Sequence, residues 1–111
     1  MADPAHSLAT YGTLAPGRAN AHQLKDLQGQ WSRGHVHGHL KEAGWGAQLG
    51  YPGLILDPQG DAVEVHLFQS ADLPAHWARL DAFEGAGYVR VAVSVETESG
   101  PIPAHIYALA P

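Results

Sequence analysis

The sequence contains no cysteine among its 111 residues. A chain without thiols forms no disulfide, offers no thiolate to a metal and has no cysteine nucleophile. Basic residues are also few, since six lysines and arginines stand against eleven aspartates and glutamates, for a formal charge of −5 at pH 7. Nucleic-acid-binding domains carry a basic patch, and this sequence has no Lys/Arg cluster. We therefore expect no nucleic-acid partner.

Long apolar runs and targeting signals are absent as well. No stretch approaches the ~20 apolar residues of a membrane helix. The N-terminal "MADPAHSLATYG" lacks the basic start and apolar run of a signal peptide. We expect a cytoplasmic protein with no membrane partner. The length suits a single domain over residues 1–111, and a hydrophobic content of 45% predicts a folded core.

Several enzyme motifs are also missing. The sequence has no G-x-S-x-G elbow, no Walker-type loop and no G-x-G-x-x-G after a predicted strand. None of its five serines lies in a nucleophile motif. What is present is "YGTLAPG", residues 11–17, at the end of the first predicted strand. Backbone N–H groups at such a bend can form an anion-binding nest.

Alternating and helical patterns predict an α+β fold. A helix capped by Asn20 is expected to run to about Leu27, and a second, capped by Asp72, is expected to end before Gly85. A Gly-Pro turn is expected at 100–101. Strands are expected at 7–14, 31–43, 54–56, 62–69, 89–96 and 104–110. Because most strands follow one another directly, the prediction is a small mixed, largely antiparallel β-barrel with peripheral helices.

The run "HVHGH" places three histidines, His35, His37 and His39, on one face of a predicted strand. Three imidazoles could form a metal platform. However, neighbours on one strand face are ~6.5–7 Å apart, which suits two ligands better than three. No carboxylate or second cluster completes the set. We expect a solvated or cross-strand-paired face, and neither a metal nor another cofactor.

Glu84 stands at the end of the second predicted helix, in step with its apolar residues. Leu73, Trp77 and Leu80 occupy positions i, i+4 and i+7, and Glu84 is at i+11. If the helix reaches Glu84, its carboxyl points toward the core and must be hydrogen-bonded or more readily protonated. Such a group is a candidate general acid or base. If the helix frays at Phe83, Glu84 turns into water. The pattern leaves both readings open.

Three stretches together resemble the gamma-glutamylcyclotransferase-like family, also called AIG2-like. They are "YGTLAPGRANAHQL", "LGYPGLILDPQG" and "LDAFEGAGYVRVAVSV". The resemblance covers the chain from about Leu8 to Tyr107 and is closest to the small bacterial members and the gamma-glutamylamine cyclotransferase branch. It implies a small barrel with a cavity at one end and a reaction that cyclises a gamma-glutamyl compound to 5-oxoproline without a metal.

The resemblance also implies roles for particular residues. Glu84 matches the general acid/base of the family. The loop that holds the α-carboxylate and amine end of the substrate matches Tyr11, Gly12, Thr13 and Leu14. Tyr88 and Arg90 flank the glutamate motif and are candidates to line the cavity. Their other interpretation is a strand-start aromatic and an exposed strand residue.

Two departures from the family pattern bear on activity. Many relatives carry a Gly-Glu pair where this chain has Val65-His66. The chain also ends four residues after Tyr107, so it is expected to lack the C-terminal extension of longer cyclotransferases and to have a more open site. An alternative is therefore a non-catalytic module that binds a carboxylate-bearing metabolite in the same cavity.

Overall fold

Strands make up most of the residues that a computed structural model describes, which are 3–11, 21–41 and 53–109. The strands are β1 (Ser7–Thr10), β2 (Gln30–Lys41), β3 (Gly53–Leu56), β4 (Asp61–Gln69), β5 (Tyr88–Thr97) and β6 (Gly100–Leu109). The α-helix is α1 (Trp77–Glu84), and the short 3₁₀ helices are η1 (Pro4–His6), η2 (Ala21–Leu24) and η4 (Leu73–Ala75).

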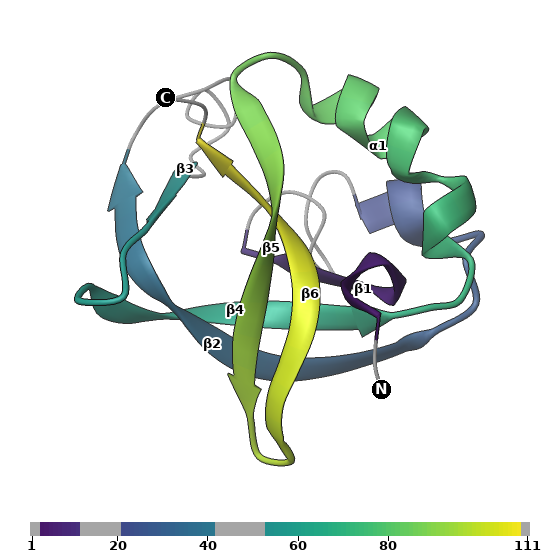
Figure 1. Cartoon of the computed structure of the whole chain (residues 1–111). Helices are drawn as coiled ribbons and strands as arrows, with labels where there is room; N and C mark the ends of the chain where they lie inside the picture. The colour runs from purple at the N-terminus through teal and green to yellow at the C-terminus, as the bar shows by residue number, and fades with distance from the viewer. Residues whose placement is uncertain (1–2, 12–20, 42–52, 110–111) are drawn as a thin grey trace.

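Five of these strands close into a barrel, as Figure 1 shows. The strand order is β3-β2-β4-β1-β6-β5, and a further pairing of β2 with β5 closes the ring. β3 lies outside the ring, paired with β2. Only β1 and β6 run parallel among the pairings of the described residues. This confirms the predicted α+β class and the mixed, largely antiparallel barrel.

The barrel interior follows from the alternation along the strands. On β4, Val63, Val65 and Leu67 are buried, whereas Ala62 before them and Glu64 between them are exposed. β2, β3, β5 and β6 contribute further buried apolar residues to the same cluster: Val36, Leu54, Val95, Ala104 and Ile106. Each fully buried aliphatic side chain contributes about 1.5–3 kcal/mol of transfer free energy, so this interior is a large source of stability.

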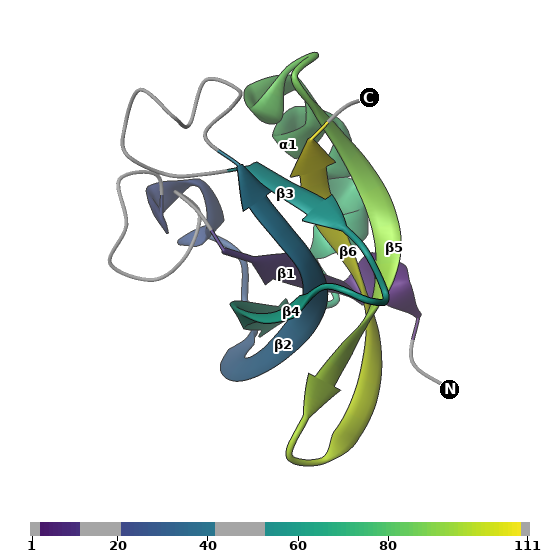
Figure 2. The ribbon, with the colours of Figure 1, turned by 90° about the vertical axis from the view of Figure 1, so that its left-hand side faces the viewer.

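A second apolar cluster lies between α1 and the outer surface of the barrel. Leu73, Trp77 and Leu80 are buried there, as the helical spacing predicts. Trp77 also donates a hydrogen bond from Nε1 to the carbonyl of Ala5, at 2.8 Å. Figures 1 and 2 both place α1 at the end of the barrel where β6 finishes, opposite the tip of the β5–β6 hairpin. The cluster therefore fixes α1 at one end of the barrel.

Both predicted helices differ in detail from the observed ones. The segment after Asn20 forms only the 3₁₀ helix η2, which ends at Leu24 and not at Leu27. Asp72 makes no capping hydrogen bond with its side chain. Its carboxylate accepts instead from the backbone N–H of Gln28, at 2.9 Å. Pro74 lies in the first turn of η4, and the α-helix begins only at Trp77.

The last hairpin also differs from the prediction. Its turn lies at Glu98 and Ser99, and Gly100 and Pro101 already belong to β6. Gly100 has a φ of 100°, a conformation that favours glycine at the end of a tight turn. Pro101 pairs with Glu96 of β5. The prediction took the Gly-Pro pair as the turn, whereas the glycine only closes it.

Among the helices of the described residues, none has the length and apolar character needed to cross a bilayer.

Candidate active site around Glu84

Glu84 is the last residue of α1, and its carboxyl lies in the protein interior. The helix extends over Trp77–Glu84, and Glu84 is only 9% exposed. Gly85 ends the helix with a φ of 80° and donates its N–H to the carbonyl of Asp81, at 3.0 Å. The positive φ turns the chain away from the helix axis, which leaves the Glu84 side chain on the buried stripe. The fraying interpretation is therefore wrong.

Burial changes the acidity of this carboxyl. Removal from water disfavours the charged form and raises the pKa of Glu84 from 4.5 to about 7. A carboxyl with this pKa exists in both protonation states near neutral pH, so it can accept a proton or donate one.

Two tyrosines, Tyr11 and Tyr107, lie within electrostatic range of Glu84. Burial raises the pKa of Tyr11, the hydrogen bond from the Leu54 N–H opposes this rise, and nearby Glu84 adds to it. The pKa of Tyr107 is raised mainly by burial, and both Asp81 and Glu84 contribute. Both phenols are therefore neutral hydroxyls at pH 7. Tyr88, partly buried, packs against the apolar cluster beneath α1. The surroundings of Glu84 thus combine apolar rings with neutral hydroxyl groups.

The hydroxyl of Tyr11 joins two strands. It donates to the carbonyl of Tyr107 on β6, at 2.7 Å, and accepts from the backbone N–H of Leu54 on β3, at 2.9 Å. Of the four residues expected to hold the substrate, Tyr11 therefore uses its side chain within the fold. The other three, Gly12, Thr13 and Leu14, lie outside the described residues.

Asp81 occupies the position three residues before Glu84 on α1. Its Oδ1 accepts from Nε of Arg90, at 2.8 Å, and from the hydroxyl of Tyr107, at 2.6 Å. Its Oδ2 accepts from Nη2 of Arg90, at 3.3 Å. Partial burial would raise the pKa of Asp81, but the hydrogen bonds from Arg90 and Tyr107 hold it below its ordinary value. Asp81 is therefore ionised at neutral pH.

The guanidinium of Arg90 is engaged on several sides. Besides the pair with Asp81, its Nη1 lies 3.3 Å from Nδ1 of His105, and its Cζ lies 4.5 Å from the ring centroid of Trp77. Tyr88 and Arg90 line a pocket of about 300 Å³ together with Asp81, Val89 and Tyr107. Both residues thus line a hollow at the end of the barrel that carries α1, and Arg90 is held there by an acidic partner.

Glu84 could be identified from the sequence, whereas Asp81 and Tyr107 were not predicted as part of the site. Asp81 had a signal, since a second acidic residue at i−3 shares the side of the helix that carries Glu84. Tyr107 had none, because it joins the site through strand pairing over a long sequence separation.

Two histidines of β2 contact the turn that joins β3 to β4. Val36 and Gly38 point inward and are buried. Nε2 of His39 lies 2.9 Å from Oδ2 of Asp57, and Nδ1 of His37 lies 3.1 Å from the carbonyl of Gly60. Within the described residues, no three His, Cys, Asp or Glu side chains are arranged to hold a metal ion. His37 and His39 are exposed, which fits the solvated face that was expected, and their partners belong to the turn and not to a paired strand.

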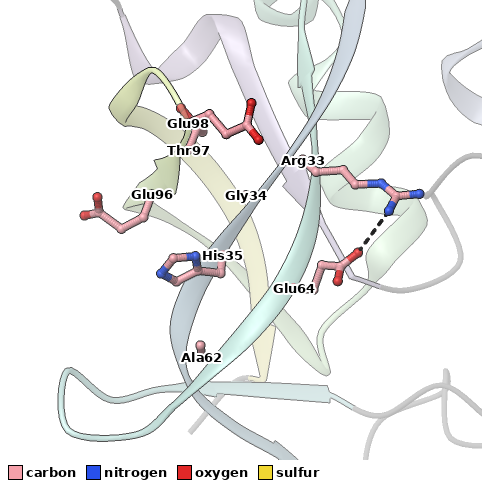
Figure 3. Close-up of a pocket in the computed structure, with 8 residues that line it drawn as sticks. All are labelled: Arg33, Gly34, His35, Ala62, Glu64, Glu96, Thr97 and Glu98. Atoms are coloured by element: carbon pink, nitrogen blue, oxygen red, sulfur yellow. Dashed lines mark ion pairs between the residues drawn. The ribbon is translucent and has the colours of Figure 1, made fainter.

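A second hollow, of about 630 Å³, lies where β2 crosses β5. It is lined by Arg33, Gly34, His35, Ala62, Glu64, Glu96, Thr97 and Glu98 (Figure 3). Figure 3 shows its carboxylates pointing in different directions, with Glu64 turned toward Arg33, 3.7 Å away. It lies near the β5–β6 hairpin tip, away from α1. It therefore has no convergent group comparable to Glu84.

Comparison with known proteins agrees with the fold. The sequence pattern of the family described as "Gamma-glutamyl cyclotransferase, AIG2-like" matches residues 8–111. The chain belongs to this family. No protein with a curated description matches the chain.

Solved structures with the fold of this AIG2-like protein come from distant organisms. YkqA of Bacillus subtilis is 27% identical with a TM-score of 0.73, and the match covers 94% of this chain but 35% of YkqA. This chain thus spans about a third of that protein. A mouse AIG2-like protein, also designated GGACT, is 24% identical with a TM-score of 0.68, covering 95% of this chain and 77% of the mouse chain.

The same fold occurs inside a larger enzyme of another kind. An allophanate hydrolase of Kluyveromyces lactis is 19% identical with a TM-score of 0.63, and the match covers 94% of this chain and 17% of the hydrolase. The fold alone therefore does not specify a reaction, and the assignment of one depends on the residues of the site.

Proposed function

We propose that this AIG2-like protein is a gamma-glutamylcyclotransferase-type enzyme. It converts a gamma-glutamyl amine or gamma-glutamyl amino acid to 5-oxoproline and releases the amine, with Glu84 as general acid/base. The observation that carries the proposal is the buried carboxyl at the end of α1, whose pKa is raised to about 7. Family membership over residues 8–111 supports the reaction class.

The reaction needs little beyond positioning and proton transfer. The α-amine of the substrate attacks its own γ-carbonyl carbon, which forms the C–N bond of a five-membered lactam. The bond from that carbon to the leaving nitrogen breaks, and the leaving nitrogen gains a proton. Because attack is intramolecular, an enzyme contributes mainly by holding the reactive conformation.

Glu84 has the acidity that the proton transfers require. As a carboxylate it takes a proton from the attacking amine, and as a carboxylic acid it returns a proton to the leaving nitrogen. A pKa near the working pH keeps both forms accessible, and such catalysis typically contributes about 10²–10⁴-fold. The proton balance closes within the substrate and Glu84, so the proposed mechanism uses no metal, nucleotide or enzyme nucleophile.

The substrate's charged end is assigned to the segment after β1. We propose that residues 11–14, Tyr11, Gly12, Thr13 and Leu14, hold the α-carboxylate and amine, with backbone N–H groups as donors. The Tyr11 hydroxyl is already bonded to β3 and β6. In the proposal it therefore holds the start of the segment in place, while the residues after it contact the substrate.

A substrate panel tests the reaction class. Gamma-glutamyl derivatives of small alkylamines and of neutral, acidic and basic amino acids are incubated with the native protein and with Glu84→Gln. Formation of 5-oxoproline is measured by mass spectrometry. We expect the native protein to cyclise some members and Glu84→Gln to lose about 10²–10⁴-fold in kcat, since it keeps the shape but transfers no proton. Full activity in Glu84→Gln would remove Glu84 from the mechanism.

A binding module is the second candidate, and the family's Gly-Glu position favours it. Here Val65 is fully buried in the barrel interior, and the ring of His66 contacts Trp31, with centroids 6.5 Å apart. The chain thus has no carboxylate at this position. A native protein that binds panel members in calorimetry without forming 5-oxoproline would support the binding module and contradict the enzyme.

A further inference from the structure

A continuous series of contacts links the helix that carries Glu84 to the strand end that begins with Tyr11. The carboxylate of Asp81 on α1 accepts from the hydroxyl of Tyr107, at 2.6 Å. The carbonyl of the same Tyr107 accepts from the hydroxyl of Tyr11, at 2.7 Å. The Tyr11 hydroxyl also accepts from the backbone of Leu54, at 2.9 Å. Three elements, α1, β6 and β3, and the end of β1 are therefore connected.

This link consists of strong or sheltered hydrogen bonds. The bond from Tyr107 to the ionised Asp81 is short and charge-assisted, a class about twice as strong as neutral pairs. Tyr107 is 4% exposed, so water competes little for its groups. Arg90 adds two bonds from β5 to the same carboxylate. The final turn of α1 is thus fixed to β5 and to β6 through one side chain.

Asp81 is not itself suited to proton transfer in this reaction. The pKa of Asp81 is held below its ordinary value, whereas the pKa of Glu84 is raised. The two carboxyls of the helix therefore differ in acidity in opposite directions. A carboxylate that remains ionised cannot supply a proton to a leaving nitrogen at neutral pH. Its partners Arg90 and Tyr107 already use both of its oxygens.

We propose that Asp81 is a positioning residue: through Tyr107 it sets the place of the Glu84 carboxyl relative to Tyr11. The inference rests on the proposed function in assigning proton transfer to Glu84. Cyclisation requires the base and the substrate anchor at a fixed separation, and a displacement of about 1 Å can cost about 10²-fold in rate. The link through Asp81, Tyr107 and Tyr11 spans that separation.

The test compares Asp81→Asn and Tyr107→Phe with the native protein and with the control Asp57→Asn. The control also removes a carboxylate with a close partner, His39, but on the outer strand β3 side of the barrel. Two quantities are measured: kcat and KM for the most rapidly cyclised panel member, and the titration of the Glu84 carboxyl carbon by ¹³C NMR. The NMR measurement needs no turnover.

In Asp81→Asn we expect kcat to fall about 10- to 100-fold and KM to stay within about threefold of the native value. The substrate anchor is kept, but its position relative to the Glu84 carboxyl is no longer fixed. The Glu84 titration midpoint is expected to move from about 7 toward 4.5 as water reaches the loosened helix end. Tyr107→Phe, which removes one hydroxyl, changes both quantities in the same direction by less. Asp57→Asn changes neither.

Other results separate the two proposals. A folded Asp81→Asn with native kcat and native Glu84 titration overturns the positioning role. A rise in KM alone overturns it too, since it would place Asp81 in direct contact with substrate. If Asp81→Asn does not fold, Tyr107→Phe decides on the same criteria. If the native protein makes no 5-oxoproline but Asp81→Asn still shifts the Glu84 titration, the proposed enzyme function is refuted. The positioning role of Asp81 is then retained.

Discussion

At the scale of single residues, the main feature is a carboxyl that the fold holds in an unfavourable environment. Glu84 is 9% exposed and has a pKa of about 7, against 4.5 for an ordinary glutamate. The difference corresponds to about 3 kcal/mol of unfolding free energy that is lost when the group is ionised. A residue retained at such a cost is a candidate for function, since a neutral side chain of the same shape would be more stable.

This cost predicts how stability depends on pH. Below pH 4.5 the carboxyl is protonated in both the folded and the unfolded chain, so its contribution is complete there. As the pH rises from 4.5 through 7, the carboxyl ionises in the unfolded chain before it ionises in the folded chain. The stability that the protonated carboxyl contributes is therefore lost over this range. Glu84→Gln should therefore leave the unfolding free energy almost unchanged at pH 4 and raise it by about 1–3 kcal/mol at pH 8.5.

Urea unfolding of both proteins at the two pH values measures this difference. Glu64→Gln, an exposed glutamate on β4, is the control and should show no comparable pH-dependent gain. Equal stability of native protein and Glu84→Gln at pH 8.5 would mean that the carboxyl is not desolvated.

The burial of Glu84 could be predicted from the sequence, but the residues that surround it could not. Its place on the stripe of Leu73, Trp77 and Leu80 follows from local periodicity, and the structure confirms its burial. The tyrosine contacts could not be predicted in this way, because Tyr11 and Tyr107 meet only through the parallel pairing of β1 with β6. Local patterns carry no information about such pairing.

At the scale of the elements, the barrel closes at a narrow seam between β2 and β5. His35 and Glu96 form the pairing of these strands within the described residues. Next to it, Gly34 lets the two backbones approach closely. A Cβ at position 34 would lie 2.6 Å from the carbonyl oxygen of Glu96 and 2.6 Å from Cγ1 of Val95. The backbone of β5 cannot move away without separating the strands.

We therefore predict that Gly34→Ala weakens the seam. The overlap should cost about 1–3 kcal/mol of unfolding free energy, typical for overpacking a close contact. Hydrogen exchange should increase for amides of β2 and β5 next to position 34 more than for those of β4. The control is Ser32→Ala, exposed two residues earlier on the same strand, which should change stability by less than about 0.5 kcal/mol. If Gly34→Ala has the stability and the hydrogen exchange of the native protein, the two strands are not in close contact at this position.

Element boundaries were predicted less well than the elements themselves. The alternation of Val63, Val65 and Leu67 identified β4 correctly, because one face of the strand lines the barrel. The start of α1 was misplaced because the Asp72 carboxylate bonds to Gln28, distant in sequence, and not to the helix N-terminus. Tertiary contacts thus decide the ends of elements whose interiors follow from pattern.

At the scale of the whole molecule, two of the hollows lie at different ends of the barrel. The pocket beside Asp81, Tyr88 and Arg90 lies at the end that carries α1, and the pocket at Gly34 and Glu96 lies near the β5–β6 hairpin tip. The α+β class could be predicted from strand succession, because a chain with few crossover helices must pair most strands antiparallel. Closure of the sheet by β2 and β5 could not, since that pairing joins distant segments.

The acidity of Glu84 also makes the whole molecule a proton acceptor or donor during ligand binding. With a pKa of about 7, a neutral solution of the protein contains both protonation states in similar amounts. A ligand that prefers one state must draw a fraction of a proton from the buffer or release one into it. We predict that calorimetric binding enthalpies of gamma-glutamyl compounds at pH 7 differ between phosphate and Tris, whose ionisation heats differ. In Glu84→Gln the enthalpies should coincide, whether or not the native protein turns the compound over.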